Sequence, residues 1–372
     1  MIDSKKSLKT IPITDHPLWK KTREKRTLLY LSLEFTARCN NNCSHCYVNL
    51  PENDAVAIKK EMTLGEIKTI VDEAVELGCL WVHITGGEPL LRTDFIDIYL
   101  YLKKKGLLIT LFTNASLISD EHIKLFKQFP PRDIEISVYG MTPEIHRKVT
   151  RETLFKETCI GIEKIIAAKL PVTLKTTILK SNFKQLDKIT TYCKDKTKSQ
   201  FRFDPFLHLR VDKDEKRNKE IRSQRLKTKE IIELEKNDPD RIIAIKKRCS
   251  ELSKTNPSKI ISKKIFKCDA GINSCYVGYD GTFKLCSSLT HKHCTYDLKN
   301  GSLSEAWKGF APSIMSKTSD NKSFKENCMN CDISSFCLWC PANADLEIGE
   351  LDGHVQYFCD MTKERFQELN KK

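Results

Sequence analysis

The sequence predicts an α/β fold with a parallel sheet, followed by a small, irregular α+β domain rich in cysteine. Up to residue 207, six short apolar segments rich in β-branched residues alternate with amphipathic helical segments. This alternation is typical of parallel strands joined by right-handed helical crossovers. Six strands are fewer than the eight that close a TIM barrel. Beyond residue 264 the periodicity fades and cysteine dominates, which is typical of a small domain held together by metal.

Length and composition favour a globular protein with more than one domain. The chain has 372 residues, of which 40% are hydrophobic and 30% are charged. No stretch of 18 apolar residues is present, and the N-terminus lacks the apolar core of a signal peptide. We therefore expect a cytoplasmic protein without a membrane partner. Its 16 cysteines are then expected to stay reduced and to serve metal or redox chemistry.

The formal net charge of +14 makes nucleic acid a partner to consider, because a basic surface attracts phosphate groups. The lysines are spread through most segments, however, without the arginine–aromatic cluster of an RNA-binding module. We interpret the charge as a solvated surface that can attract an acidic substrate, and we expect no nucleic-acid partner.

The chain divides into four expected parts. Residues 1–26 form a polar arm in which Pro12 and Pro17 are expected to break any helix. Residues 27–207 carry the alternation, with strands expected at 28–36, 80–85, 107–113, 133–139, 171–179 and 200–205.

Helices are expected between these strands. Thr63 and Glu66 form a capping box that begins a helix running to Leu77, and Gly78 stands in the C-cap position. Further helices are expected at 95–104, ended by Gly106, and at 120–129, 155–169 and 183–194.

The last two parts differ in composition. Residues 208–264 are dense in Lys, Arg and Glu, with Pro239 and Pro257 interrupting helical stretches, and are predicted to form a solvated bridge. Residues 265–372 form the cysteine-rich domain, in which Asp280-Gly281 is the expected turn of a hairpin.

Three cysteines follow the first predicted strand. Cys39, Cys43 and Cys46 have the spacing CxxxCxxC. A [4Fe–4S] cluster in an electron carrier takes four cysteine ligands, so three thiolates leave one iron open to bind something else. Zinc is the alternative, although it normally takes four ligands and His45 is the only nearby candidate.

A glycine turn follows the second predicted strand, at Gly86-Gly87-Glu88-Pro89. Two glycines let the backbone approach a ligand closely, and Glu88 offers a carboxylate to an ammonium group. Ligands of parallel α/β folds lie beyond the carboxyl ends of the strands, so this turn and the cysteines are expected at one edge. By itself, such a tetrapeptide favours a simple tight turn over a ligand site.

Together, CxxxCxxC and Gly-Gly-Glu resemble the motifs of the radical S-adenosylmethionine (radical SAM) superfamily. The resemblance implies a partial (β/α)6 TIM-like barrel and a [4Fe–4S] cluster on Cys39, Cys43 and Cys46 that chelates SAM. It also implies that SAM is contacted by Gly86, Gly87, Glu88, Pro89, Asn114, Ser137 and Lys175. For the last three, a turn asparagine, a satisfied hydroxyl and a solvated lysine are the structural alternatives.

The C-terminal cysteines resemble the SPASM (twitch-type) extension of that superfamily, which holds two auxiliary [4Fe–4S] clusters. Two residues separate Cys337 from Cys340 where the family pattern has three, which leaves the role of Cys340 open. The roles of Cys275 and Cys294 are open as well. A zinc ribbon is the alternative. By the family's arrangement the nearer cluster takes Cys268, Cys275, Cys286 and Cys340, and the outer one takes Cys328, Cys331, Cys337 and Cys359.

The resemblance implies an enzyme that reductively cleaves SAM to a 5′-deoxyadenosyl radical and oxidatively modifies a peptide or protein, for example by forming a thioether or another crosslink. It further implies an external one-electron reductant of the flavodoxin or ferredoxin type. The alternatives are small-molecule or cofactor maturation of the haem-precursor type, and a non-catalytic iron–sulfur electron-transfer or zinc-binding protein.

Overall fold

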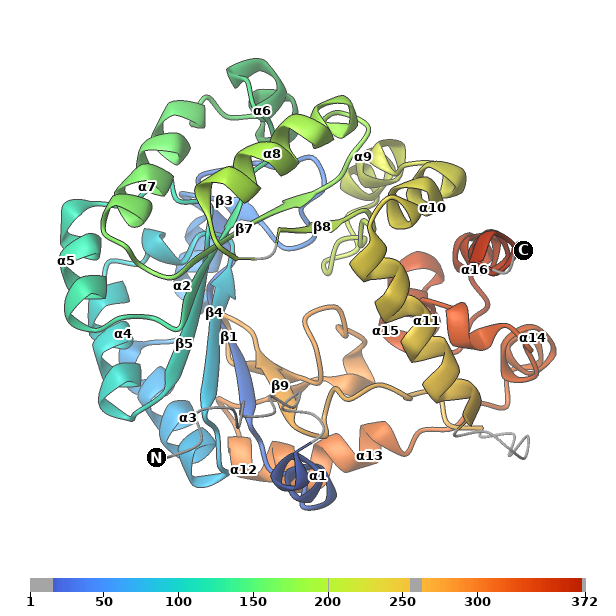
Figure 1. Cartoon of the computed structure of the whole chain (residues 1–372). Helices are drawn as coiled ribbons and strands as arrows, with labels where there is room; N and C mark the ends of the chain where they lie inside the picture. Colours follow the sequence, from blue (N-terminus) through green and yellow to red (C-terminus); the bar gives the residue numbers. More distant parts are fainter. Residues whose placement is uncertain (1–15, 200, 255–262, 370–372) are drawn as a thin grey trace, which may run out of the picture.

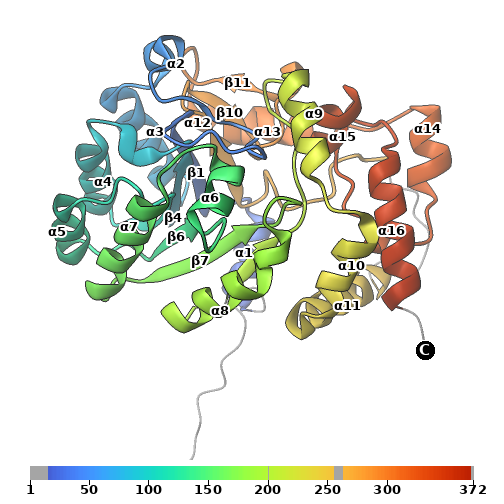
Figure 2. The same ribbon diagram turned by 90° about the horizontal axis from the view of Figure 1, so that it is seen from above.

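The structure of the chain, a computed structural model, describes residues 16–199, 201–254 and 263–369. Pro12, Pro257 and the last three residues of the expected tail lie outside them. Figure 1 shows one curved sheet with helices along its outer face and the C-terminal helices across its open side. Figure 2 gives the same arrangement from above.

The sheet has nine strands among the described residues, in the order β11-β10-β9-β1-β4-β5-β6-β7-β8. The six from β1 to β8 in this order are all parallel, which confirms the expected α/β fold. Their bounds are β1 Tyr30–Thr36, β4 Trp81–Gly86, β5 Leu108–Thr113, β6 Asp133–Ser137, β7 Val172–Thr177 and β8 Arg202–Asp204.

Helices cover the outer face of these strands (Figure 1). The first of them, α3 (Leu64–Glu76), begins at the capping box of Thr63 and Glu66, and Gly78 follows it with a φ of +96°. The others are α4 Phe95–Lys104, α5 Asp120–Gln128, α6 Pro143–Thr150, α7 Phe155–Ala167 and α8 Leu186–Lys196, the last preceded by a 3₁₀ turn at Phe183–Gln185.

The cysteine-rich region adds three strands to the same sheet. β9 (Ser274–Val277) pairs in parallel with β1, and β10 (Thr282–Lys284) returns antiparallel to β9. The turn between them is the expected one, with Gly281 at a φ of +84°. β11 (Tyr296–Asp297) completes the edge. The C-terminal region is therefore hydrogen-bonded to the first strand of the barrel.

The N-terminal arm contains a helix, contrary to the expectation that Pro17 would break one. α1 (Pro17–Glu24) has Pro17 in its first turn, where the missing N–H costs no intrahelical hydrogen bond. After the helix, the Arg26 guanidinium donates to the carbonyl of Trp307 (3.1 Å). The arm is thus fixed to the C-terminal region.

The described part of residues 208–264, which leaves out 255–262, contains three helices: α9 Glu215–Gln224, α10 Thr228–Lys236 and α11 Pro239–Lys254. Pro239 begins α11 instead of interrupting a helix. The segment is also less solvated than the sequence suggested, because Arg210, Ile221, Ile231 and Glu235 are all buried.

The remaining helices and strands are short, except for the last two helices. They are β2 Arg38–Cys39, β3 Leu50–Pro51, α2 Ala55–Lys60, α12 Leu303–Glu305, α13 Ala311–Met315, α14 Lys322–Phe324, α15 Pro341–Ile348 and α16 Gln356–Leu369. The expected tail at Phe366 is part of α16, which continues as far as Leu369.

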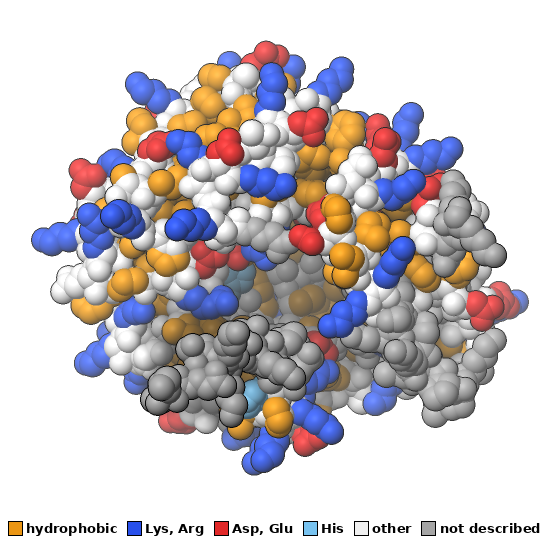
Figure 3. Space-filling model, in the orientation of Figure 1, with side chains coloured by type: hydrophobic (Ala, Val, Ile, Leu, Met, Phe, Trp, Pro, Cys, Tyr) orange, Lys and Arg blue, Asp and Glu red, His pale blue; other side chains and the backbone are white. Residues whose placement is uncertain are grey.

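The molecule is hollowed at the centre of the face shown in Figure 3, where lysines and arginines are interspersed with acidic and apolar side chains over the rim. None of the helices in the described ranges is both long and apolar enough to span a membrane.

Candidate active site

The three-cysteine loop lies at the carboxyl end of β1 and is held by backbone hydrogen bonds. The N–H groups of Asn42 and Ser44 donate to the carbonyls of Thr150 and Val149, at 2.9 and 2.8 Å. Those carbonyls belong to the last turn of α6, where backbone oxygens lack intrahelical partners. The loop therefore caps a helix end while it presents its thiols.

The thiols of this loop lie close enough to one another to interact electrostatically. Burial raises the pKa of the Cys39 and Cys43 thiols, and the negative charge of Cys46 adds to the effect at both. Backbone N–H groups point at two of the sulfurs, with Asn41 N 3.4 Å from Cys39 Sγ and Asn49 N 3.3 Å from Cys46 Sγ. Such N–H groups stabilise thiolates, which is the form that binds iron.

The two glycines at the end of β4 pack directly against the backbone that leads into Cys39. Gly87 N donates to Thr36 O (2.7 Å), and a Cβ on Gly87 would lie 2.1 Å from Arg38 O. Gly86 has a φ of +137°, and its Cβ would lie 2.1 Å from Thr36 O. Only glycine fits here. Pro89 follows in a buried 3₁₀ turn, Pro89–Leu91.

Glu88 is fully buried and its carboxylate joins the ends of two strands. It accepts hydrogen bonds from Thr113 Oγ1 (2.8 Å), Asn114 N (2.7 Å) and Leu90 N (3.2 Å). Burial raises the pKa of Glu88 to about 7, and the three donors oppose that rise. The carboxylate thus fixes the end of β4 to the end of β5.

Asn114 lies beside the cysteine loop, whereas Lys175 makes a different set of contacts. Asn114 Nδ2 donates to Asn40 Oδ1 at 2.8 Å and lies 3.9 Å from Cys39 Sγ. Lys175 Nζ instead pairs with Glu135 (2.9 Å) and sits 3.1 Å from the ring centroid of Phe112. Burial lowers the pKa of Lys175 to about 8.

Ser137 is Lys175's register partner on the inner face of the sheet. Burial raises the pKa of Tyr139 well above its ordinary value, and the Ser137 hydroxyl opposes that rise.

The outer set of C-terminal cysteines gathers in one place. Burial raises the pKa of the Cys328 thiol to about 12, and the charges of Cys359, Cys337 and Cys331 add to it. His354 Nε2 also lies 3.0 Å from Cys359 Sγ. The four side chains that the sequence assigned to the outer cluster are therefore neighbours.

The inner set gathers only in part. Burial raises the pKa of the Cys340 thiol to about 12, with contributions from Cys286 and Cys268. Cys275 lies elsewhere. It is on β9, in register with Leu31, whose side chain is buried under the helices. The thiol that acts on it electrostatically is that of Cys79. Cys294 is also buried in the apolar core, near Lys317 and Asp345.

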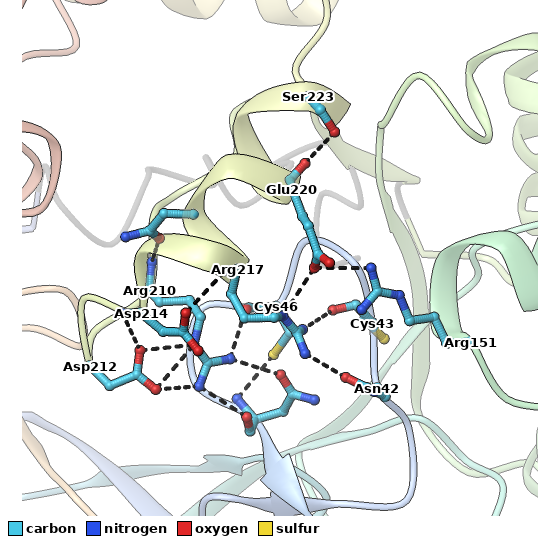
Figure 4. Close-up of polar contacts among 12 residues, drawn as sticks. Asn42, Cys43, Cys46, Arg151, Arg210, Asp212, Asp214, Arg217, Glu220 and Ser223 are labelled. Atoms are coloured by element: carbon cyan, nitrogen blue, oxygen red, sulfur yellow. Dashed lines mark hydrogen bonds and ion pairs between the residues drawn. The ribbon is translucent and has the colours of Figure 1, made fainter.

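Several residues at the site carry no motif that sequence reasoning could have recognised. Tyr139 is half-buried, its ring lies 5.0 Å from that of His45, and the charges of Cys43, Cys46 and Cys39 act on its hydroxyl. Arg210 and Arg217 reach the cysteine loop from the segment expected to be a solvated bridge (Figure 4). A lone Tyr after a strand and an Arg in a charged segment give no sequence signal.

The residues present fit a [4Fe–4S] cluster with SAM. Three neighbouring thiols supply the donor set for a cluster with one open iron. In the loop itself, and considering only the described residues, Asn41 Oδ1, Ser44 Oγ and His45 Nδ1 are buried without a hydrogen-bond partner, as expected where a further group completes a site. Across the described ranges, no three His, Cys, Asp or Glu side chains form a group that could hold a single metal ion.

Comparison with known proteins matches the barrel to one family. Residues 33–192 match the family described as the radical SAM superfamily. The AdoMet-dependent heme synthase of Methanosarcina barkeri is 30% identical over 166 residues, 44% of this chain and 47% of that protein. The GTP 3′,8-cyclase of Clostridium perfringens is 30% identical over 174 residues, 46% of this chain and 53% of that protein. The chain spans about half the length of the curated relatives it matches.

Solved structures share the fold over almost the whole chain. Streptococcus suis SuiB bound to its precursor peptide SuiA has a TM-score of 0.67 at 14% identity, covering 95% of this chain and 83% of that one. Native anSMEcpe with bound AdoMet has a TM-score of 0.62 at 15% identity, covering 91% and 96%. At these identities the likeness shows the fold alone, including the region beyond the barrel.

Proposed function

We propose that this chain, a radical SAM enzyme by the domain at residues 33–192, reductively cleaves SAM and oxidatively modifies a peptide or protein. One observation carries the first half of the proposal. The thiols of Cys39, Cys43 and Cys46 lie within electrostatic range of one another at the carboxyl end of β1, and Cys39 also feels the charge of Glu88, whose contact with Asn114 fixes β4 to β5.

The chain's own residues bind, orient and enclose the reacting groups. Cys39, Cys43 and Cys46 would hold the cluster, and Gly86 and Gly87 hold the end of β4 against the backbone that leads into Cys39, next to which SAM would bind. When bound, a cluster on these cysteines would supply the electron for cleaving SAM to methionine and a 5′-deoxyadenosyl radical, and auxiliary clusters would supply an acceptor for the electron left on the substrate. The burial of Cys43 and the partial burial of Cys39 and Cys46 limit side reactions with water.

A peptide substrate is supported by fold and by the C-terminal cysteines. SuiB, with the same fold, has been solved with its precursor peptide, and anSMEcpe has been solved with peptides as well. Seven C-terminal cysteines lie in two groups, one of four around Cys328 and one of three around Cys340, and these groups suit two auxiliary clusters. We further propose an external one-electron reductant of the flavodoxin or ferredoxin type.

Reconstitution without oxygen tests SAM cleavage. The chain is loaded with iron and sulfide, and about twelve irons are expected, four for each cluster. With SAM and dithionite, the loaded chain should form 5′-deoxyadenosine, and Cys43→Ala should abolish its formation. Cys79→Ala, which removes a core thiol outside the motif, is the matched control. A fully loaded chain that forms no 5′-deoxyadenosine, or one that binds zinc without sulfide, would refute the proposal.

A second candidate is small-molecule or cofactor maturation. It is favoured by the curated relatives, since the matched proteins include a haem synthase and a GTP 3′,8-cyclase. The two candidates are separated by adding either a peptide captured with the chain, or a porphyrin or GTP. The substrate is the additive that raises 5′-deoxyadenosine formation above the level without substrate and whose own mass changes.

A further inference from the structure

The segment before and within α9 folds onto the three-cysteine loop, although its composition resembles a solvated bridge. Arg210 is 3% exposed. Its guanidinium donates to Asn49 Oδ1 and Asn49 O, both at 3.2 Å, and more weakly to Cys46 O at 3.4 Å. Asp212 holds the guanidinium in place from the other side, with Oδ1 2.9 Å from Nε (Figure 4). Arg210 thus fixes the outgoing end of the loop.

Arg217, seven residues later in the first turn of α9, fixes the middle of the same loop. Its Nη1 donates to Asn42 Oδ1 at 2.6 Å and its Nη2 donates to Cys43 O at 2.8 Å. Figure 4 shows the guanidinium lying between these two residues and Glu220. Because the planar fork makes two directed hydrogen bonds at once, it constrains the loop more tightly than a single-point cation would.

The opposite side of this segment contacts α15, the helix whose N-cap residue is Cys340. His208 Nδ1 lies 3.0 Å from Asn343 Oδ1, and Asn343 N lies 3.4 Å from Cys340 Sγ. Lys213 pairs with the fully buried carboxylate of Asp345 at 2.9 Å. Residues 207–225 therefore connect the three-cysteine loop to the inner C-terminal cysteines.

The arginine that contacts Cys43 shares its carboxylate with a second arginine. Asp212 pairs with Arg210, and Asp214 also acts on Arg210. Arg151 and Arg217 share a single carboxylate, that of Glu220, at 3.0 and 3.4 Å. Arg217 therefore places beside Cys43 a guanidinium that has no carboxylate to itself. A nearby cation stabilises the reduced, more negative form of an iron–sulfur cluster, which is one of the ways in which proteins set its potential.

We propose that residues 207–225 form a clamp in which Arg210 and Arg217 are positioning residues for the three-cysteine loop, and in which Arg217 raises the reduction potential of the cluster bound there. This inference rests on the proposed function, because it requires a cluster on Cys39, Cys43 and Cys46. The clamp makes one-electron reduction of that cluster easier.

The test measures the cluster itself and not turnover. The chain is reconstituted without oxygen, and three variants are compared: Arg217→Gln, Arg217→Lys and Lys219→Gln. The last removes the same charge from an exposed position on the same helix and serves as the control. The readouts are iron content, the reduction midpoint of the SAM-binding cluster followed by electron paramagnetic resonance, and the rate at which a chelator removes iron.

Arg217→Gln should lower the equilibrium constant for one-electron reduction roughly tenfold, which is about 59 mV for a one-electron couple. Arg217→Lys keeps the charge but loses the fork, so it should keep the midpoint and lose iron several-fold faster. Lys219→Gln should change neither. The clamp is refuted if Arg217→Gln has the midpoint of Lys219→Gln, or if Arg217→Lys loses iron at the wild-type rate. A wild-type chain that takes up no cluster would instead refute the proposed function.

Discussion

Two glycines bring the end of β4 into contact with the backbone that leads into Cys39. Their effect is steric: the space that a side chain would need is already filled by carbonyl oxygens of residues 36–38. The position of the cysteine loop therefore depends on Gly86 and Gly87, because neither has a side chain that would push the backbone of residues 36–38 away.

Gly87→Ala should move the loop. The new Cβ would lie 2.1 Å from Arg38 O and 2.6 Å from Ala37 O, so the backbone must shift. We expect a loss of about 2 kcal/mol in the free energy of unfolding and a loss of iron from the SAM-binding site, measured by urea denaturation and iron analysis. Gly309→Ala, with open space around its Cβ, is the control. Equal behaviour of the two variants would contradict this explanation.

Cys275 differs from the seven C-terminal cysteines that gather in two groups, because it faces the helix-covered side of the sheet. We expect Cys275→Ala to keep the wild-type iron content and to cost about 1 kcal/mol as a small core truncation. Cys340→Ala, by contrast, should lose about four irons, because it removes a member of the group that gathers with Cys286 and Cys268. Loss of four irons from Cys275→Ala would show that Cys275 is a ligand.

Among the elements, the pairing of β9 with β1 joins the C-terminal region to the barrel. Glu34 on β1 is buried at this junction, where Tyr279 N donates to its Oε2 at 3.3 Å. Burial raises the pKa of Glu34 to about 7, and Lys284 opposes the rise. The protonated carboxyl is therefore the form that the folded chain favours.

This shift predicts a pH dependence of stability. A carboxyl whose pKa is higher in the folded chain stabilises it fully below pH 4.5, and this contribution is lost as the pH rises through 7. The loss amounts to about 3 kcal/mol. Glu34→Gln should remove this component, so that the variant's free energy of unfolding in urea falls less between pH 4.5 and 7 than that of the metal-free wild type.

Glu88 contributes in the same direction in both proteins, so only the difference between them reports on Glu34. Glu76→Gln changes an exposed carboxylate on α3 and should leave the pH dependence as it is in the wild type. An unchanged slope in Glu34→Gln would show that the carboxyl of Glu34 does not titrate in this range.

At the scale of the whole molecule, a buried ion pair connects α10 to the C-terminal helix, α16. Arg365 on α16 donates to both oxygens of Glu235 on α10, at 2.9 and 2.7 Å. A third donor of Arg365 reaches Phe336 O at 2.9 Å, next to Cys337. Arg241 also contacts Glu235, at 3.3 Å. The outer cysteines are therefore tied to α10 as well as to α16.

Arg365→Met should destabilise the chain by about 3 kcal/mol, because it leaves a buried carboxylate with a single, more distant cation. The double variant Glu235→Met/Arg365→Met removes the unpaired charge and should regain most of that loss. Both are measured by urea unfolding of the metal-free chain. A double variant as unstable as Arg365→Met alone would mean that packing, and not the unpaired carboxylate, causes the loss.

The sequence by itself determined what depends on local pattern. Apolar periodicity marked the six parallel strands, and the Thr63–Glu66 capping box marked the start of α3 because both partners lie within one helical turn. The expected hairpin at Gly281 formed for the same reason. The short motifs at Cys39–Cys46 and Gly86–Pro89 were visible because the residues that act together are adjacent in the chain.

Only the tertiary structure decided which distant residues meet. Arg217 and Asn42 are 175 positions apart, and nothing in either neighbourhood distinguishes this arginine from the other basic residues of its segment. The direction of the Cys275 side chain follows from the register of β9 against β1, since a shift of one residue would turn it to the other face. Strand pairing and long-range ion pairs depend on the closed fold, so local sequence patterns do not carry them.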